Sequence, residues 1–282
     1  MRKLDLNKFC ASNFSYFRFP IERFLDDARQ LGIDAIELWG AEPHLNVDEV
    51  DMGDLARLRK LLKDRGQHLL CFTPEQCIYP INIAAKEDRL RERSVKYFFR
   101  CIEICNEMST PMLFLTSGWG YEDEQREDAW KRARDSISRI SDVAAKAGVS
   151  LVLEALQPVE SNVVNTVQDI ERMRAEVNSP ALKVAIDTVG MAVSGNTVAQ
   201  YMKAFGSDVL HTHFIDGTPA GHMAWGDGNL PLDTFISELA AGDYTGYFSF
   251  ELVGPRYWLD PIDPLRRSID AIRASIVRQE LA

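Results

Sequence analysis

The sequence predicts an α/β protein, specifically a (β/α)8 TIM barrel with eight parallel strands and outer helices. Short apolar or β-branched runs alternate with longer amphipathic stretches from one end of the 282-residue chain to the other. We count eight such strand–helix units, which is the number that closes a barrel. No Gly-rich phosphate loop follows the first expected strand, so an open doubly wound sheet is the weaker alternative.

The elements follow from the hydrophobic pattern. The expected strands are short apolar runs at residues 8–13, 35–39, 68–73, 112–116, 150–155, 183–187, 209–215 and 247–252. The expected helices carry apolar residues at a spacing of three or four and cover residues 21–31, 50–64, 88–108, 126–147, 167–177, 197–205, 231–241 and 264–279. Left-handed helix ends are expected at Gly32, Gly66 and Gly148. Because no Ser/Gly-rich linker interrupts the pattern, we expect a single domain over residues 1–282.

Composition limits the classes of partner. The formal net charge is −10, whereas a groove that follows a phosphate backbone needs a basic stripe, so we expect no nucleic-acid binding. No run approaches the roughly 18–20 apolar residues that cross a bilayer, and the first residues lack the apolar segment of a secretion signal. The five cysteines form no zinc-site pattern and are expected to be reduced and mostly buried. We therefore expect a cytoplasmic protein that binds a small molecule and no membrane.

Four successive expected strands end on residues that bind metals. In a TIM barrel the C-terminal ends of the strands form the active site. Glu154, Asp187, His213 and Glu251 stand at these ends and would meet at one rim. Three carboxylates and one imidazole suit Mn²⁺, Mg²⁺ or Co²⁺, with Mn²⁺ preferred here, and a divalent cation offsets the repulsion between the carboxylates. His211 points to the same side of its strand as His213 but one layer deeper, where we expect a supporting role.

These residues belong to a wider set of motifs. The chain resembles the xylose-isomerase-like barrel superfamily of sugar isomerases and epimerases, and specifically its ketose 3-epimerase and fructoselysine 3-epimerase branch. The resemblance extends from about residue 33 to residue 252 and is carried, in order, by IELWG with Pro43–His44, TPE followed by YPIN, LEALQPVESNVV, the Asp of AID, HTHFID, HMAWGDGNLPL and FEL.

The resemblance implies roles for particular residues. Glu154, Asp187, His213 and Glu251 match the metal ligands of the family. Glu154 and Glu251 also match its acid/base pair, which inverts C3 of a ketose through a cis-enediolate. Glu160 matches a carboxylate that contacts the sugar oxygens near C1 and C2. Relatives in this branch are usually dimers or tetramers, so the resemblance also implies a homo-oligomer.

The sequence departs from the free-ketose epimerases at two positions. Gly190 and Pro219 stand where that group carries a substrate-binding His and Arg, both of which hold the C1–C2 end of the sugar. A ketose substituted at C1, such as an Amadori sugar, is therefore an open candidate beside a free ketose. Further substrate contacts are expected from residues on or just after strand ends, namely Trp39, His44, Glu75, Trp119 and His222.

Several other functions fit the same residues. An aldose–ketose isomerase, a keto-inositol dehydratase and the catalytic subunit of a C-glycoside-cleaving lyase can all use one divalent metal to reach an enolate. A DNA-repair endonuclease on this barrel would need more than the five histidines present and less negative charge. A non-catalytic sugar-binding barrel would not need both acid/base carboxylates.

Overall fold

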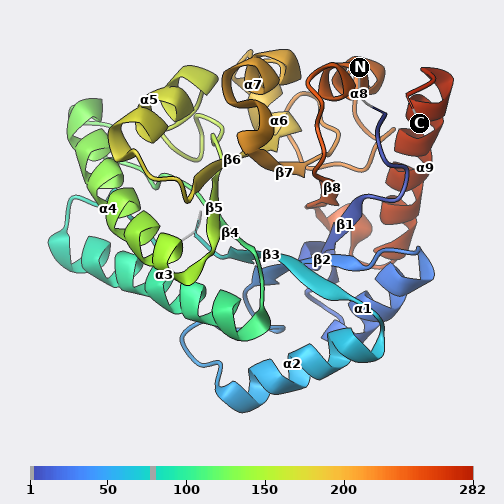
Figure 1. Ribbon diagram of the computed structural model, residues 1–282, viewed down its shortest axis with the longest axis horizontal. Coiled ribbons are helices and arrows are strands. Elements are labelled where there is room, and N and C mark those ends of the chain that lie inside the picture. The colour runs from blue at the N-terminus through green and yellow to red at the C-terminus, as the bar shows by residue number, and fades with distance from the viewer. Residues whose placement is uncertain (1–2, 77–80, 282) are drawn as a thin grey trace.

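Eight parallel strands close into a barrel in chain order in the computed structural model, which describes residues 3–76 and 81–281 (Figure 1). The strands are β1 (Phe9–Ser12), β2 (Ala35–Gly40), β3 (His68–Pro74), β4 (Met112–Leu115), β5 (Ser150–Leu153), β6 (Leu182–Asp187), β7 (Val209–His213) and β8 (Tyr247–Phe250). Each strand pairs with its neighbours in the chain, and β1 pairs with β8 to complete the ring. The predicted (β/α)8 barrel is confirmed.

The helices surround this ring, as Figure 1 shows. They are α1 (Ile21–Gln30), α2 (Met52–Asp64), α3 (Asp88–Met108), α4 (Arg126–Ala147), α5 (Val167–Val177), α7 (Val198–Phe205), α8 (Leu232–Ala241) and α9 (Ile262–Arg278). Each covers a stretch predicted from its amphipathic pattern. The predicted left-handed ends are present, with φ of 74° at Gly32, 68° at Gly66 and 71° at Gly148.

Several element ends differ from prediction by one or two residues; β7 and β8, for example, each end two residues earlier than predicted. Strand β5 ends two residues earlier than predicted because its partner β4 ends at Leu115, which pairs with Leu153. A short helix, α6 (Thr188–Val193), follows β6 and was not predicted. At six residues, with Gly190 inside it, α6 is too short for the hydrophobic pattern to distinguish it from a loop.

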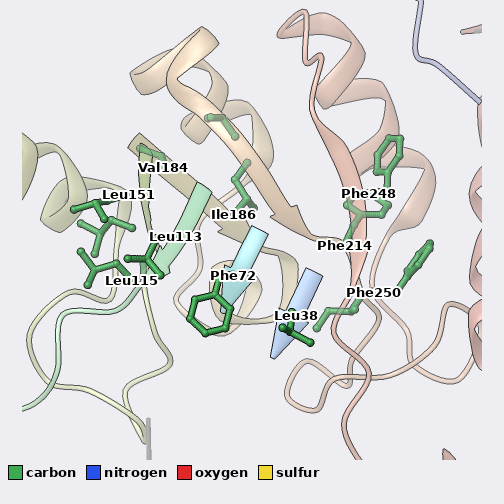
Figure 2. Close-up of a cluster of buried hydrophobic side chains, with 14 of the residues drawn as sticks. Leu38, Phe72, Leu113, Leu115, Leu151, Val184, Ile186, Phe214, Phe248 and Phe250 are labelled. Atoms are coloured by element: carbon green, nitrogen blue, oxygen red, sulfur yellow. The ribbon is translucent and has the colours of Figure 1, made fainter. Parts of the chain in front are cut away.

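The strands bury both of their faces. Outward-facing residues pack beneath the helices, and Figure 2 shows part of this layer, including Leu38, Leu113, Ile186 and Phe250. Inward-facing residues form a second, smaller apolar cluster inside the barrel, made of Cys10, Ala35, Leu70, Cys71, Met112, Phe114, Val152 and Ala185. Fully burying one large apolar side chain stabilises a fold by about 1.5–3 kcal/mol. The two layers therefore form a rigid frame for the strand ends.

The described cysteines are reduced and buried, as the sequence predicts. Cys10, Cys71, Cys101 and Cys105 are buried free thiols, whereas Cys77 lies outside the described residues. Residues 79 and 80 of the YPIN motif also lie outside them. Across residues 3–76 and 81–281, no helix is long and apolar enough to span a bilayer.

Candidate active site

The four predicted ligand residues meet at the C-terminal rim of the barrel. His213 ends β7, and its Nδ1 atom lies 3.5 Å from Oε1 of Glu154, 3.7 Å from Oδ2 of Asp187 and 3.4 Å from Oε2 of Glu251. Asp187 ends β6, while Glu154 and Glu251 directly follow β5 and β8. Three carboxylates thus converge on one imidazole nitrogen; Glu154, Asp187 and His213 are buried, and Glu251 is partly buried.

The backbone orients Asp187 for this site. Its Oδ1 accepts hydrogen bonds of 2.7 Å from the backbone N–H groups of Val189 and Gly190, which caps the start of α6. Its Oδ2 is buried without a hydrogen-bond partner, and so is Nδ1 of His213. A buried polar atom without a partner costs free energy. These two atoms, facing one another across the cluster, are therefore candidate metal ligands.

His213 is held from its other side by Glu37, a residue that sequence reasoning missed. The His213 Nε2 atom lies 2.9 Å from Oε1 of Glu37, and the His213 ring stacks on Phe114 at 4.5 Å. Nε2 of His211 lies 2.8 Å from the other Glu37 oxygen, consistent with the deeper position predicted for His211. The two imidazoles hold the pKa of Glu37 well below its usual value, although burial acts in the opposite direction. An acid within the apolar run AIELWG was the available signal.

His222 joins the cluster from the loop after β7. Its Nδ1 lies 2.9 Å from Oε2 of Glu251, and its Nε2 lies 3.9 Å from Oδ2 of Asp187. Burial lowers the pKa of His222, but these two carboxylates outweigh it and raise the pKa to about 9. The sequence predicted a substrate contact for His222, and the structure places it directly against two predicted ligands.

The two predicted acid/base carboxylates have opposite electrostatic environments. Burial, together with the charge of Asp187, raises the pKa of Glu154 to about 8. Burial also acts on Glu251, but the charge of His213 and the hydrogen bond from His222 hold its pKa below the usual value. Carboxylates whose pKa values are driven apart can divide the roles of proton donor and proton acceptor.

A cavity of about 850 Å³ opens above this cluster. Its wall includes the predicted contact residues Trp39, Glu75, Trp119, Glu160 and His222. The indole N–H of Trp39 donates to Oε2 of Glu75 at 3.1 Å. Glu160 is half-buried, and burial raises its pKa.

His44 is the predicted contact residue that the structure does not bring to the cavity wall. Its Nδ1 lies 2.7 Å from the side-chain nitrogen of Asn13, and its Nε2 lies 2.8 Å from the carbonyl oxygen of Phe19. Both ring nitrogens are therefore used to join the segments that follow β1 and β2. The structure gives His44 this connecting position instead of a place in the cavity.

Comparison with known proteins connects this geometry to a family. The fructoselysine 3-epimerase of Shigella flexneri is 28% identical over 265 residues, which cover 93% of this chain and 96% of that protein. A solved L-ribulose 3-epimerase shares the fold with a TM-score of 0.80 at 20% identity, covering 100% of this chain and 98% of that one. The IOLI protein, solved with a bound zinc atom, superposes with a TM-score of 0.78 at 17% identity over 96% of this chain and 98% of its own.

The family comparison covers most of the barrel. The family described as xylose isomerase-like TIM barrel matches residues 25–275, which include every strand from β2 to β8 and all four predicted ligand residues. The chain belongs to the xylose isomerase-like TIM barrel family.

Proposed function

We propose that this protein is a metal-dependent sugar epimerase that inverts C3 of a ketose carrying a substituent at C1. The observation that carries the proposal is the convergence of Glu154, Asp187 and Glu251 on Nδ1 of His213, within 3.4–3.7 Å, below a large cavity. The relatives named above that carry an activity in their names are 3-epimerases of sugars. Epimerases are isomerases, so the proposed enzyme class is isomerase.

The cluster suits a divalent metal ion. Two of its atoms, Oδ2 of Asp187 and Nδ1 of His213, are buried without hydrogen-bond partners. Glu154, Asp187 and His213 each offer one ligand atom, and these atoms all lie within 4.8 Å of one another. With Glu251 they form an oxygen-rich donor set, which favours Mn²⁺, with Mg²⁺ or Co²⁺ as alternatives. The zinc atom of the IOLI protein is a precedent on the same fold.

The proposed reaction transfers one proton on each face of the sugar carbon. A C–H bond beside a ketone is weakly acidic, so its removal needs a base and stabilisation of the negative charge that develops. When bound, a divalent ion supplies Lewis-acid stabilisation of that charge. Glu154 and Glu251, which match the acid/base pair of the family that the chain resembles, would accept the proton on one face and deliver one to the opposite face. In the reverse direction the two residues exchange roles.

The cavity supports a substituted, uncharged or cationic sugar. Ligand sites for drug-sized molecules occupy about 300–1,000 Å³, so a cavity of about 850 Å³ has room for a sugar and a substituent. Among the described residues of its wall, none is Lys or Arg, while Glu75 and Glu160 are acidic. Among the described wall residues, a phosphorylated sugar would therefore find only the imidazole of His222 as a countercharge.

The position of Gly190 agrees with this choice of substrate. A Cβ atom at Gly190 would meet the carbonyl oxygen of Ala155 at 3.0 Å, so a His at this position would require the backbone to shift. The close packing of α6 against the segment after β5 therefore favours glycine at position 190, where the free-ketose epimerases carry a His. The C1 end of the sugar gains space that the larger side chain would fill.

Deuterium exchange tests the proposed function. The protein, loaded with Mn²⁺, is incubated in D₂O with free ketohexoses and with a C1-substituted ketosamine such as fructoselysine. We expect deuterium at C3 of recovered substrate and product, with faster exchange in the substituted sugar. Mass spectrometry and NMR measure the position and the rate.

Other outcomes of this experiment would indicate a different reaction or a different substrate. Deuterium at C1 or C2 would indicate an aldose–ketose isomerase, and a product of different mass would indicate a dehydratase or lyase. Faster exchange in a free ketohexose would overturn the substrate preference but not the epimerase. Absence of exchange at C3 in every ketose, with metal bound, would refute the epimerase proposal.

A further inference from the structure

The carboxylate of Glu37 lies inside the barrel and is fully buried. Its Oε1 lies 2.5 Å from the hydroxyl of Thr73 and 2.9 Å from Nε2 of His213. Its Oε2 lies 2.5 Å from the hydroxyl of Ser249 and 2.8 Å from Nε2 of His211. A carboxylate has about four lone-pair sites. All of them are therefore used, by residues of β3, β7 and β8.

This arrangement determines where the imidazole protons lie. A carboxylate only accepts hydrogen bonds, so Nε2 of both His211 and His213 must carry a proton. The Nε2 proton of His213 leaves Nδ1 as the ring atom that can bind a metal. This Nδ1 is buried, has no hydrogen-bond partner and faces the carboxylates of the rim.

The ring of His213 is also fixed in orientation. Its face stacks on Phe114 with an angle of 11° between the ring planes. Rotation about the side chain would break the bond to Glu37 and the stacking together. One contact at Nε2 and one at the ring face thus hold Nδ1 at the centre of the three carboxylates.

We propose that Glu37 is a positioning residue that acts through His213: it holds the proton on Nε2, aims Nδ1 at the metal and strengthens Nδ1 as a ligand. Carboxylates that accept the second N–H of a metal-bound histidine have this effect in metal sites generally. The inference rests on the metal site of the proposed function and is independent of which sugar the protein converts.

The Glu37→Gln variant tests the proposal, with Ser249→Ala as the matched control. The amide keeps the size of the side chain, but it loses the charge and turns one of the two acceptor atoms into a donor. Ser249→Ala removes one hydrogen bond from the same buried carboxylate and leaves its bond to His213 intact. Affinity for Mn²⁺ is measured by competition with a chelator, and melting of the metal-free proteins measures stability.

We expect Glu37→Gln to bind Mn²⁺ about 10–100-fold more weakly than the unaltered protein. We expect Ser249→Ala to keep an affinity close to that of the unaltered protein even if it melts at a lower temperature. Equal affinities in Glu37→Gln and the unaltered protein would overturn the proposal. So would an equal loss of affinity in both variants, because that result would follow from damage to the barrel interior.

If Glu37→Gln does not fold, a measurement on the unaltered protein tests the same proposal. In ¹⁵N NMR of the histidine rings of the Zn²⁺-loaded protein, we expect His213 to show a protonated Nε2 and a metal-bound Nδ1. Metal bound through Nε2, or no metal bound at all, would overturn the inference. Glu37-dependent metal binding without exchange at C3 would instead refute only the epimerase.

Discussion

At the scale of single residues, the environment gives chemically identical side chains different properties. Glu154 is buried, Glu251 is partly buried and both contact His213, yet the pKa of Glu154 is raised to about 8 and that of Glu251 is lowered. The difference follows from their neighbours. His222 lies 2.9 Å from Glu251 and its positive charge stabilises the carboxylate, whereas Asp187 adds a like charge beside Glu154.

Replacing either carboxylate by its amide should impair turnover. Glu154→Gln and Glu251→Gln keep the size of the side chain but remove its ability to carry a proton. We expect each to lower kcat by at least about 10²-fold, the usual contribution of a general acid or base. Steady-state kinetics on the substrate found by deuterium exchange measures this, with Glu171→Gln, an exposed position on α5, as the control. Near-normal kcat with normal metal content would mean that the residue is only a ligand.

At the scale of elements, the loop after β7 is organised by one buried carboxylate. Asp216 accepts hydrogen bonds of 2.8–3.0 Å from four backbone N–H groups of this loop, those of Gly217, Gly226, Gly228 and Leu230. A Cβ atom at Gly228 would lie 2.5 Å from Oδ1 of Asp216, so glycine is required for this close approach. Because His222 is on the same loop, Asp216 also sets the position from which His222 reaches Glu251.

Removing the Asp216 carboxylate should therefore destabilise the loop and the site together. Asp216→Ala leaves four backbone N–H groups without this acceptor, that of Gly217 buried and the other three partly buried or exposed, at a cost of about 1–3 kcal/mol for each group that water does not reach. We expect a lower free energy of unfolding, measured in urea, and a raised KM because His222 is no longer held. Asp227→Asn is the control, since this partly exposed carboxylate of the same loop pairs with Arg267 at the surface. An equal loss of stability in both variants would contradict the role given to Asp216.

At the scale of the whole molecule, the predicted ligands connect four consecutive strands. Glu154, Asp187, His213 and Glu251 come from β5, β6, β7 and β8 or the residues directly after them. A bound ion would hold half of the barrel together at its C-terminal rim. Binding to the folded state alone stabilises it by about 2.7 kcal/mol at a ligand concentration of 100 Kd.

This stabilisation should grow with pH. Because the pKa of Glu154 is raised to about 8 in the metal-free protein, a proton must leave before the carboxylate can bind a cation. The raised pKa also stabilises the metal-free fold at low pH, and that contribution is lost as pH rises through about 8. We expect the difference in melting temperature with and without Mn²⁺ to increase between pH 6 and pH 8. Scanning calorimetry at each pH measures it, and a constant or shrinking difference would contradict the assignment.

The barrel and its rim could be predicted because they depend on local patterns and one general rule. Alternating apolar runs and amphipathic stretches mark the strands and helices, and parallel strands of a barrel all end at the same rim. Glu154, Asp187, His213 and Glu251 occupy those ends, so the convergence of their side chains follows once the barrel is assumed. The barrel and the main cluster of the candidate site can therefore be predicted from the sequence.

Contacts between distant parts of the chain could not be predicted, because they depend on how the barrel closes. Glu37 on β2 meets His213 on β7 because strands far apart in the sequence face one another across the barrel interior. His222 reaches Glu251 because its loop folds around Asp216, and His44 stays outside the cavity because Asn13 and Phe19 bind its ring. Local pattern cannot encode these pairings, because each depends on which side chains the closed barrel brings within hydrogen-bonding distance.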